Sequence, residues 1–283
     1  MAEDASAVGE TPGAAGPGIP LVLLAGERRG GSPLAKHFDV PYSVLVPLAD
    51  ASPILWTLRA LAGVTRLRGG ALLASETLTA ANANLLRPYL TQLQLTRLTP
   101  EPGPAASTCK ALRQSPQRPV LVTTADHALL TPAIVDRFID AANARHADLI
   151  VGLVPYETVQ RAFPESRRTV LRFRDGDYCG SNLFLVRTTR GDQAIREWQR
   201  FETLRKQPWR LAARLGPLLL LRYVLGRLKL ADASARFSAL SGAKVAFVPI
   251  DEARAAVDVD SLADWELADA LLREADAPAT GTA

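Results

Sequence analysis

The sequence has few cysteines, and neither of them belongs to a metal or redox motif. The 283 residues include two cysteines, Cys109 and Cys179, which stand far apart and outside any Cys-x-x-Cys pair. Dense cysteine pairing is typical of small secreted domains, so two isolated cysteines in a chain of this size indicate a reducing compartment. We therefore expect free thiols and a cytoplasmic protein.

The chain also lacks the patterns of nucleic-acid-binding and secreted proteins. Its formal net charge is +4, but no dense run of Lys and Arg is interleaved with aromatic residues, and we expect no nucleic-acid partner. Residues 1–19 have neither the basic start nor the apolar centre of a signal peptide. We predict that 1–19 and 275–283 are disordered tails. The mildly basic balance suits a protein that handles phosphate groups or lies near an anionic membrane.

Short apolar runs alternate with helix-like segments between the two tails. Thr131 and Pro132, for example, form a typical helix start, with Thr at the N-cap and Pro in the first turn. Such alternation predicts one α/β domain over residues 20–274, with a three-layer, mostly parallel, Rossmann-like sheet. The predicted strands are 21–24, 70–74, 120–124, 147–153 and 245–249, and the predicted helices include 53–61, 80–90, 106–113 and 262–273.

Residues 198–230 differ from the rest because their pattern is helical throughout and rich in arginine. The segment carries Trp209 and a run of leucines at 218–221. This run is too short, and too interrupted by arginine, to span a bilayer. Two interpretations stay open: a pair of helices that pack on the core with exposed arginines, or an insertion that lies peripherally on an anionic membrane surface.

Three features that can carry chemistry follow predicted strands, at the edge where open α/β sheets bind ligands. A loop rich in Gly and Arg follows the first strand, Asp126 follows the strand at 120–124, and Asp258 and Asp260 lie near the last helix. Glycines let backbone N–H groups approach a polyphosphate, and carboxylates at strand ends can hold Mg²⁺ against it. Each feature also has a plain structural explanation, as a turn, a helix-entry residue or a helix cap.

Together, these features resemble the nucleotidyltransferases with a glycosyltransferase-A-like fold, typified by molybdenum-cofactor guanylyltransferase and the sugar-phosphate nucleotidylyltransferases. The similarity lies in the Leu-Ala-Gly and Arg/Gly loop at 23–31, the proline-containing stretches at 45–55, the Asp motif at 124–132 and the closing Asp-x-Asp motif at 256–264. It extends over nearly the whole predicted domain.

The resemblance implies Mg²⁺-dependent transfer of a nucleoside monophosphate from an NTP to a small phosphorylated acceptor or a lipid precursor, with release of pyrophosphate. It also implies a role for individual residues. The implied catalytic residues are Arg28, Lys36 and Asp126; the nucleotide-binding residues are Leu24, Ala25, Gly26, Arg28, Gly30, Gly31, Ala105 and Ser107; the acceptor-binding residues are Gly180 and Asn182; and the magnesium ligands are Asp126, Asp258 and Asp260.

One position departs from the family pattern. Ser43 stands four residues before Pro47, where the resemblance places a phosphate-binding lysine. A serine cannot neutralise a triphosphate, so Lys36 or an arginine of the loop would have to substitute for the lysine. Three functions therefore stay open: an active nucleotidyltransferase, a nucleotide-binding or scaffold protein that has lost turnover, and a glycosyltransferase that uses a nucleotide-sugar.

Overall fold

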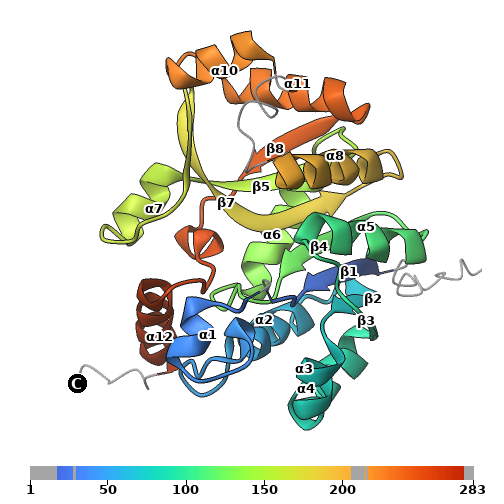
Figure 1. Cartoon of the computed structure of the whole chain (residues 1–283), viewed down its shortest axis with the longest axis vertical. Helices are drawn as coiled ribbons and strands as arrows, with labels where there is room; N and C mark the ends of the chain where they lie inside the picture. Colours follow the sequence, from blue (N-terminus) through green and yellow to red (C-terminus); the bar gives the residue numbers. More distant parts are fainter. Residues whose placement is uncertain (1–17, 28–29, 205–213, 215, 277–283) are drawn as a thin grey trace, which may run out of the picture.

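A mixed sheet of eight strands, with helices on both of its faces, forms the centre of the protein (Figure 1). The computed structural model describes residues 18–27, 30–204, 214 and 216–276. The strands are β1 (Ile19–Leu24), β2 (Leu67–Leu73), β3 (Leu95–Leu98), β4 (Val120–Thr124), β5 (Leu149–Pro155), β6 (Val170–Phe173), β7 (Gly176–Val186) and β8 (Val245–Pro249). The helices are α1 (Pro33–His37), α2 (Pro53–Ala62), α3 (Glu76–Ala81), α4 (Ala83–Leu93), α5 (Pro104–Gln114), α6 (Pro132–Asn143), α7 (Tyr156–Ala162), α8 (Gly191–Leu204), α10 (Pro217–Val224), α11 (Leu230–Ser241) and α12 (Leu262–Asp276), with short 3-10 turns at Ser43–Leu45 and Ala253–Ala256.

The strand order is β3-β2-β1-β4-β7-β5-β8, with β6 paired to β7. The pairs β1–β2, β1–β4, β2–β3 and β5–β8 are parallel, whereas β7 runs antiparallel to β4, β5 and β6. The predicted strands are all present, as β1, β2, β4, β5 and β8. The sequence analysis missed β3, β6 and β7; in β7, the polar residues Asp177, Ser181 and Asn182 interrupt the apolar pattern on which strand prediction depends.

Side chains of β1 alternate between the two faces of the sheet. Leu21 and Leu23 pack in one cluster with residues of α2, α4 and α6, and Val22 and Leu24 pack in another with residues of α5 and α8. Successive side chains of a strand point to opposite faces, so a strand buried on both sides reads as a continuous apolar run. The predicted α/β fold with three layers is therefore confirmed.

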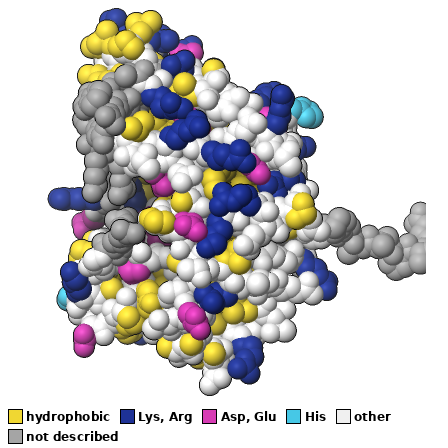
Figure 2. Space-filling model, turned by 45° about the vertical axis from the view of Figure 1, so that its right-hand side comes forward, with side chains coloured by type: hydrophobic (Ala, Val, Ile, Leu, Met, Phe, Trp, Pro, Cys, Tyr) yellow, Lys and Arg dark blue, Asp and Glu magenta, His cyan; other side chains and the backbone are white. Residues whose placement is uncertain are grey.

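The Arg-rich segment 198–230 is only partly helical in the described residues. It contains the end of α8 and all of α10, but Gly226 has a φ of +64° and residues 225–229 are not helical, because a left-handed glycine ends the helix there. No residue of α10 is buried. Hydrophobic side chains accordingly gather at the upper end of the molecule (Figure 2). Trp209 lies outside the described residues.

The ends of the domain lie close to the predicted boundaries. Strand β1 begins at Ile19, one residue inside the predicted tail, and α12 continues to Asp276, beyond the predicted end at residue 274. Residues 1–17 and 277–283, which make up most of both predicted tails, lie outside the described residues. Both cysteines are buried free thiols. Within the described ranges, no helix combines the length and hydrophobicity needed to cross a membrane.

Gly70 is required by the close approach of β2 to β1. Its φ is +123°, and a Cβ at this position would lie 1.9 Å from the carbonyl oxygen of Leu21. We expect Gly70→Ala to lower the free energy of unfolding by ~2–6 kcal/mol, because backbone strain and overpacking each cost ~1–3 kcal/mol. Gly180→Ala is the matched control, since a Cβ on this strand glycine meets nothing within 4 Å. Urea denaturation measures both variants, and an equal effect of the two substitutions would contradict this explanation.

Candidate active site

A cavity of about 430 Å³ opens where β1 and β4 end. Leu24 and Thr124, the last residues of these strands, line its floor, and the loop after β1, the start of α5 and the segment before α12 surround it. This is the carboxyl edge of the parallel part of the sheet, where the sequence analysis expects the ligand. Of the predicted site residues, the cavity is lined by Leu24, Gly26, Gly31, Ser107, Asp126, Asn182, Asp258 and Asp260.

Other predicted site residues do not line the cavity. Ala25 and Ala105 are buried, Gly30 and Gly180 are exposed, and Arg28 lies outside the described residues. Buried alanines in a strand end and a first helical turn can support a loop by packing, but their side chains do not reach a ligand. Their predicted contacts with nucleotide are therefore limited to backbone groups.

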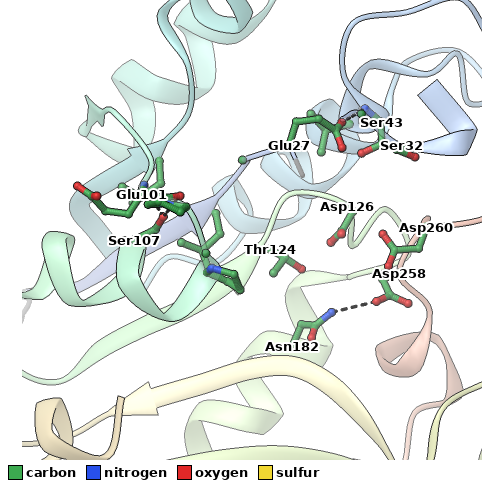
Figure 3. Close-up of a pocket in the computed structure, with 18 of the residues that line it drawn as sticks. Glu27, Ser32, Ser43, Glu101, Ser107, Thr124, Asp126, Asn182, Asp258 and Asp260 are labelled. Carbon is green, nitrogen blue, oxygen red and sulfur yellow. Dashed lines mark hydrogen bonds between the residues drawn. The ribbon is translucent and has the colours of Figure 1, made fainter. Parts of the chain in front are cut away.

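Three carboxylates, those of Asp126, Asp258 and Asp260, lie together on one side of the cavity (Figure 3). Asp126 follows β4, whereas Asp258 and Asp260 come from the segment between the second 3-10 turn and α12. A hydrogen bond from the Val259 N–H to the carbonyl oxygen of Asp126, 3.0 Å long, joins the two segments directly. The alternation around Val259, which is buried, turns both neighbouring aspartates toward the cavity.

Burial and the neighbouring carboxylates change the acidity of Asp126. Desolvation, followed by repulsion from Asp258, raises the pKa of Asp126 to about 7. Its Oδ1 is buried and has no hydrogen-bond partner in the described part of the chain. A buried carboxylate oxygen without a donor is costly, so this atom fits a cation supplied from outside the protein.

Asp258 is held in place by two side chains. Its Oδ1 accepts a hydrogen bond from Arg168 Nη1 at 3.0 Å, and its Oδ2 accepts one from Asn182 Nδ2 at 3.3 Å (Figure 3 shows the second). Arg168 also pairs with Asp264 at 2.5 Å, and its side chain is only 6% exposed. Asn182 adopts a φ of +51°, which asparagine tolerates better than most residues.

Arg168 is a residue of the site that the sequence analysis missed. It lies in the loop between α7 and β6, outside every family motif and among other charged residues, so the sequence offers no signal that distinguishes it. Its guanidinium compensates two of the acidic side chains near the cavity, Asp258 and Asp264. A buried arginine that bridges two carboxylates both neutralises and orients them.

The loop after β1 closes on the segment that contains Ser43. The Ser43 N–H donates a hydrogen bond to Glu27 Oε2 at 2.7 Å, and both residues line the cavity. Lys36, the predicted substitute for the missing lysine, is exposed on α1 and does not line the cavity. Its Cε nevertheless lies 3.8 Å from the position that a Cβ on Gly31 would occupy, so a modest rotation of its long side chain brings the ammonium group to the loop.

The described cavity lining is acidic. It includes Glu27, Glu101 and the three aspartates, whereas none of the described lining residues is a lysine or an arginine. A triphosphate would be repelled by such a surface unless cations accompany it. The predicted Arg28 and its neighbour Arg29, which belong to the same loop, lie outside the described residues.

The opposite side of the cavity is formed by the start of α5. Ser107 Oγ accepts a hydrogen bond from the Glu101 N–H at 2.8 Å, which fixes the proline-rich loop in front of the helix. Glu202 of α8 approaches the same helix start, where its Oε2 accepts from the Ala105 N–H at 3.3 Å. A carboxylate at a helix N-terminus is favourable, and it occupies a donor that a ligand phosphate would otherwise use.

His127, next to Asp126, lies beneath the site. It is fully buried, and desolvation lowers its pKa to about 4. Within the described ranges neither ring nitrogen has a hydrogen-bond partner. The imidazole is therefore neutral at physiological pH and does not line the cavity, which argues against a direct role as a base.

No three Asp, Glu, His or Cys side chains of the described chain are arranged as a ready-made metal site. Mg²⁺ in nucleotide enzymes is typically bound by one or two carboxylates, with water and substrate phosphates as the remaining ligands. The free Oδ1 of Asp126 and the nearby carboxylates fit this second arrangement. The ligands predicted from the sequence thus lie together, but they do not form a closed cage.

The raised pKa of Asp126 makes stability depend on pH. A carboxyl whose pKa is higher in the folded than in the unfolded protein contributes stability at low pH, and this contribution is lost as the pH rises toward 7. We expect Asp126→Asn, measured in a chelator by urea denaturation, to be more stable than wild type by ~1–3 kcal/mol at pH 8. The difference should shrink steadily toward pH 4. Parallel pH profiles of variant and wild type would contradict the assigned pKa; Asp39→Asn, at an exposed position, serves as the control.

Known proteins share both the fold and part of the sequence. Residues 44–184 match the family model of the MobA-like NTP transferase domain. A hypothetical transferase from Thermus thermophilus superposes with a TM-score of 0.73 at 29% identity, over 88% of this chain and 99% of that chain. The 4-diphosphocytidyl-2C-methyl-D-erythritol synthase from Anaerococcus prevotii superposes with a TM-score of 0.54 at 12% identity, over 90% of this chain and 96% of that chain. No curated protein sequence matches the chain.

The similarity to the synthase and the family match carry different weight. At 12% identity, the synthase shares the fold alone, whereas the family match covers the motif at Asp126 and also Asn182, which the sequence analysis predicts to contact the acceptor. The family, the mostly parallel sheet and the position of the cavity agree with the sequence-based prediction. Residues 44–184 of the chain therefore carry the pattern of a MobA-like NTP transferase domain.

Proposed function

We propose that the protein is a Mg²⁺-dependent nucleotidyltransferase, which moves a nucleoside monophosphate from an NTP to a small phosphorylated acceptor. The proposal rests on the position of Asp126, Asp258 and Asp260, which line the same cavity at the carboxyl edge of the sheet. This cavity is large enough for a nucleotide. The family match supports nucleotidyl transfer in general.

We propose a position in the cavity for each part of the substrates. The phosphates would lie along the loop at 26–31, where Gly31 adopts a φ of +74° and leaves the backbone accessible. The base would lie toward Gly103 and Ser107, on the side of α5. The acceptor would enter from the side of Asn182, whose amide already contacts Asp258.

Asp126 and either Asp258 or Asp260 would hold the metal. When bound, Mg²⁺ would neutralise the negative charge that the NTP phosphates carry in the transition state of the transfer. The protein itself has to keep the carboxylates ionised and correctly oriented. Asp126 must be ionised, and its raised pKa places this ionisation near neutrality, whereas Arg168 and Asn182 keep Asp258 in a single orientation.

Transfer itself requires no protein nucleophile. An oxygen of the acceptor phosphate, already ionised at neutral pH, attacks the α-phosphorus in line. A new P–O bond forms while the bond from the α-phosphorus to the β-phosphate oxygen breaks, and pyrophosphate leaves with the electron pair. Chemistry of this kind depends on positioning and charge neutralisation. The cavity would position the substrates, and Mg²⁺ together with a cation of the protein would neutralise the phosphates.

The central test is pyrophosphate release from CTP, GTP, ATP and UTP with Mg²⁺, against a panel of phosphorylated alcohols and sugars. We expect release with one pair of substrates, and a fall of about 100-fold or more in Asp126→Asn, because a group that stabilises developing charge is typically worth ~10²–10³ in rate. Asp39→Asn, at an exposed position that does not line the cavity, should keep the wild-type rate.

The same assay separates the other functions. Metal-dependent nucleotide binding without pyrophosphate release from any pair would favour the nucleotide-binding or scaffold protein, for which Ser43 is the specific argument. Release of a nucleoside diphosphate from a nucleotide-sugar would favour the glycosyltransferase. Full activity of Asp126→Asn would reject the proposed centre altogether.

Lys36 is proposed to supply the cation that Ser43 lacks. We expect Lys36→Met to lower kcat/KM for the NTP by roughly 100-fold, as the loss of a preorganised cation does, and Ser43→Lys to restore most of this loss in the double variant. Ser43 lines the cavity, so a lysine there reaches the same phosphates. Lys244→Met is the control, because Lys244 is exposed next to β8 and outside the cavity lining. Wild-type kinetics of Lys36→Met would assign the cation elsewhere.

A further inference from the structure

Helix α10 presents an apolar face to the solvent. Leu218, Leu221, Val224 and Leu225, here called the α10 face, are exposed by 70%, 53%, 74% and 54%. Residues 218, 221 and 225 recur at the spacing that places side chains on one side of a helix. Single exposed apolar side chains are common, but four of them, three on α10 and Leu225 directly after it, form a patch.

Contacts on its other side hold α10 in this orientation. The ring of Tyr223 packs edge-on against Phe173 of β6, with 6.1 Å between the ring centroids. Arg222 Nη2 pairs with Asp232 of α11 at 2.7 Å. These two contacts fix which side of the helix faces the protein, so the exposure of the α10 face follows from the way the helix packs.

Basic residues surround the α10 face. Arg222 belongs to the helix, and Arg227 and Lys229 follow it directly and are exposed. Two acids that contact this part of the protein are engaged: Asp232 pairs with Arg222, and Asp175 Oδ1 accepts from the Leu230 N–H at 2.9 Å. Dark-blue basic side chains accordingly border the hydrophobic group at the upper end of the molecule (Figure 2).

We propose that the α10 face is a docking site for an anionic membrane surface. A short helix with exposed leucines and flanking Lys and Arg is the arrangement that inserts apolar side chains among lipid headgroups while its cations contact anionic lipid. The protein as a whole is also positively charged, at +4, which favours approach to a negative surface. The proposal concerns a surface outside the cavity and does not depend on the proposed function.

A second copy of the chain fits this surface less well. Stable interfaces bury roughly 800 Å² per partner, and four partly exposed aliphatic side chains supply well below that area. A symmetric contact through α10 would also bring Arg222, Arg227 and Lys229 of both copies together, and like charges in an interface are unfavourable. An anionic surface attracts the same three side chains.

Co-sedimentation of the full chain with lipid vesicles tests the proposal. Vesicles of phosphatidylcholine alone and of phosphatidylcholine mixed with phosphatidylglycerol are the two probes. We expect binding to the anionic vesicles only, weakened by salt, and a partition coefficient about tenfold or more lower for the double variant Leu221→Asp/Val224→Asp. Leu85→Asp is the matched control, since Leu85 is 56% exposed on α4, and it should bind like wild type.

Each other outcome overturns the proposal. Absence of binding to anionic vesicles, equal binding to neutral vesicles, or equal loss in Leu85→Asp and in the double variant would each do so. A concentration-dependent dimer in analytical ultracentrifugation that the double variant abolishes, without vesicle binding, would assign the face to a second copy instead. Circular dichroism and thermal unfolding of all variants show that the substitutions, made at exposed positions, leave the fold intact.

Discussion

Electrostatic repulsion among Asp126, Asp258 and Asp260 is the constraint around which the site is organised. Three carboxylates in one cavity wall are unfavourable unless something compensates them, and the protein compensates only in part. Arg168 and Asn182 hold Asp258, while Asp126 responds by taking a pKa near neutrality. Under the proposed function, a divalent cation would relieve the remaining repulsion, and the bound cation would in turn reduce the repulsion between the acidic cavity and a polyphosphate.

The proposed site therefore assigns metal binding and neutralisation of the phosphates to different side chains. In the proposed function, the carboxylates at the sheet edge would bind the metal, and the cations for the phosphates would come from the loop after β1 and from α1. The hydrogen bond between Glu27 and the Ser43 backbone ties that loop to the position where the family pattern has a lysine. A substitution at residue 43 thus acts on loop geometry through its backbone and on charge through its side chain.

The sequence predicted the fold and the carboxylates because both depend on local patterns. Buried strands such as β4 appear as continuous apolar runs, and Asp126, Asp258 and Asp260 follow family motifs. The antiparallel strand β7 was missed because polar residues interrupt it. Arg168 could not be found, since its role comes from tertiary contacts with Asp258 and Asp264 that join distant parts of the chain. The sequence also could not show that Ala25, Ala105 and Gly180 stay out of the cavity lining, because this depends on how their elements pack.

The hydrogen bond between Val259 and Asp126 has a consequence for the order in which the protein is made. Synthesis proceeds from the N-terminus, and β1 to β4 can begin to pair before the segment that contains Val259 has left the ribosome. Until then, Asp126 stands without the other two aspartates. A nascent chain can thus acquire much of its sheet while it remains unable to gather a divalent cation with a nucleotide. Under the proposed function, only the finished molecule would bind nucleotide with its cation, and cellular nucleotide would stabilise completed chains in preference to partial ones.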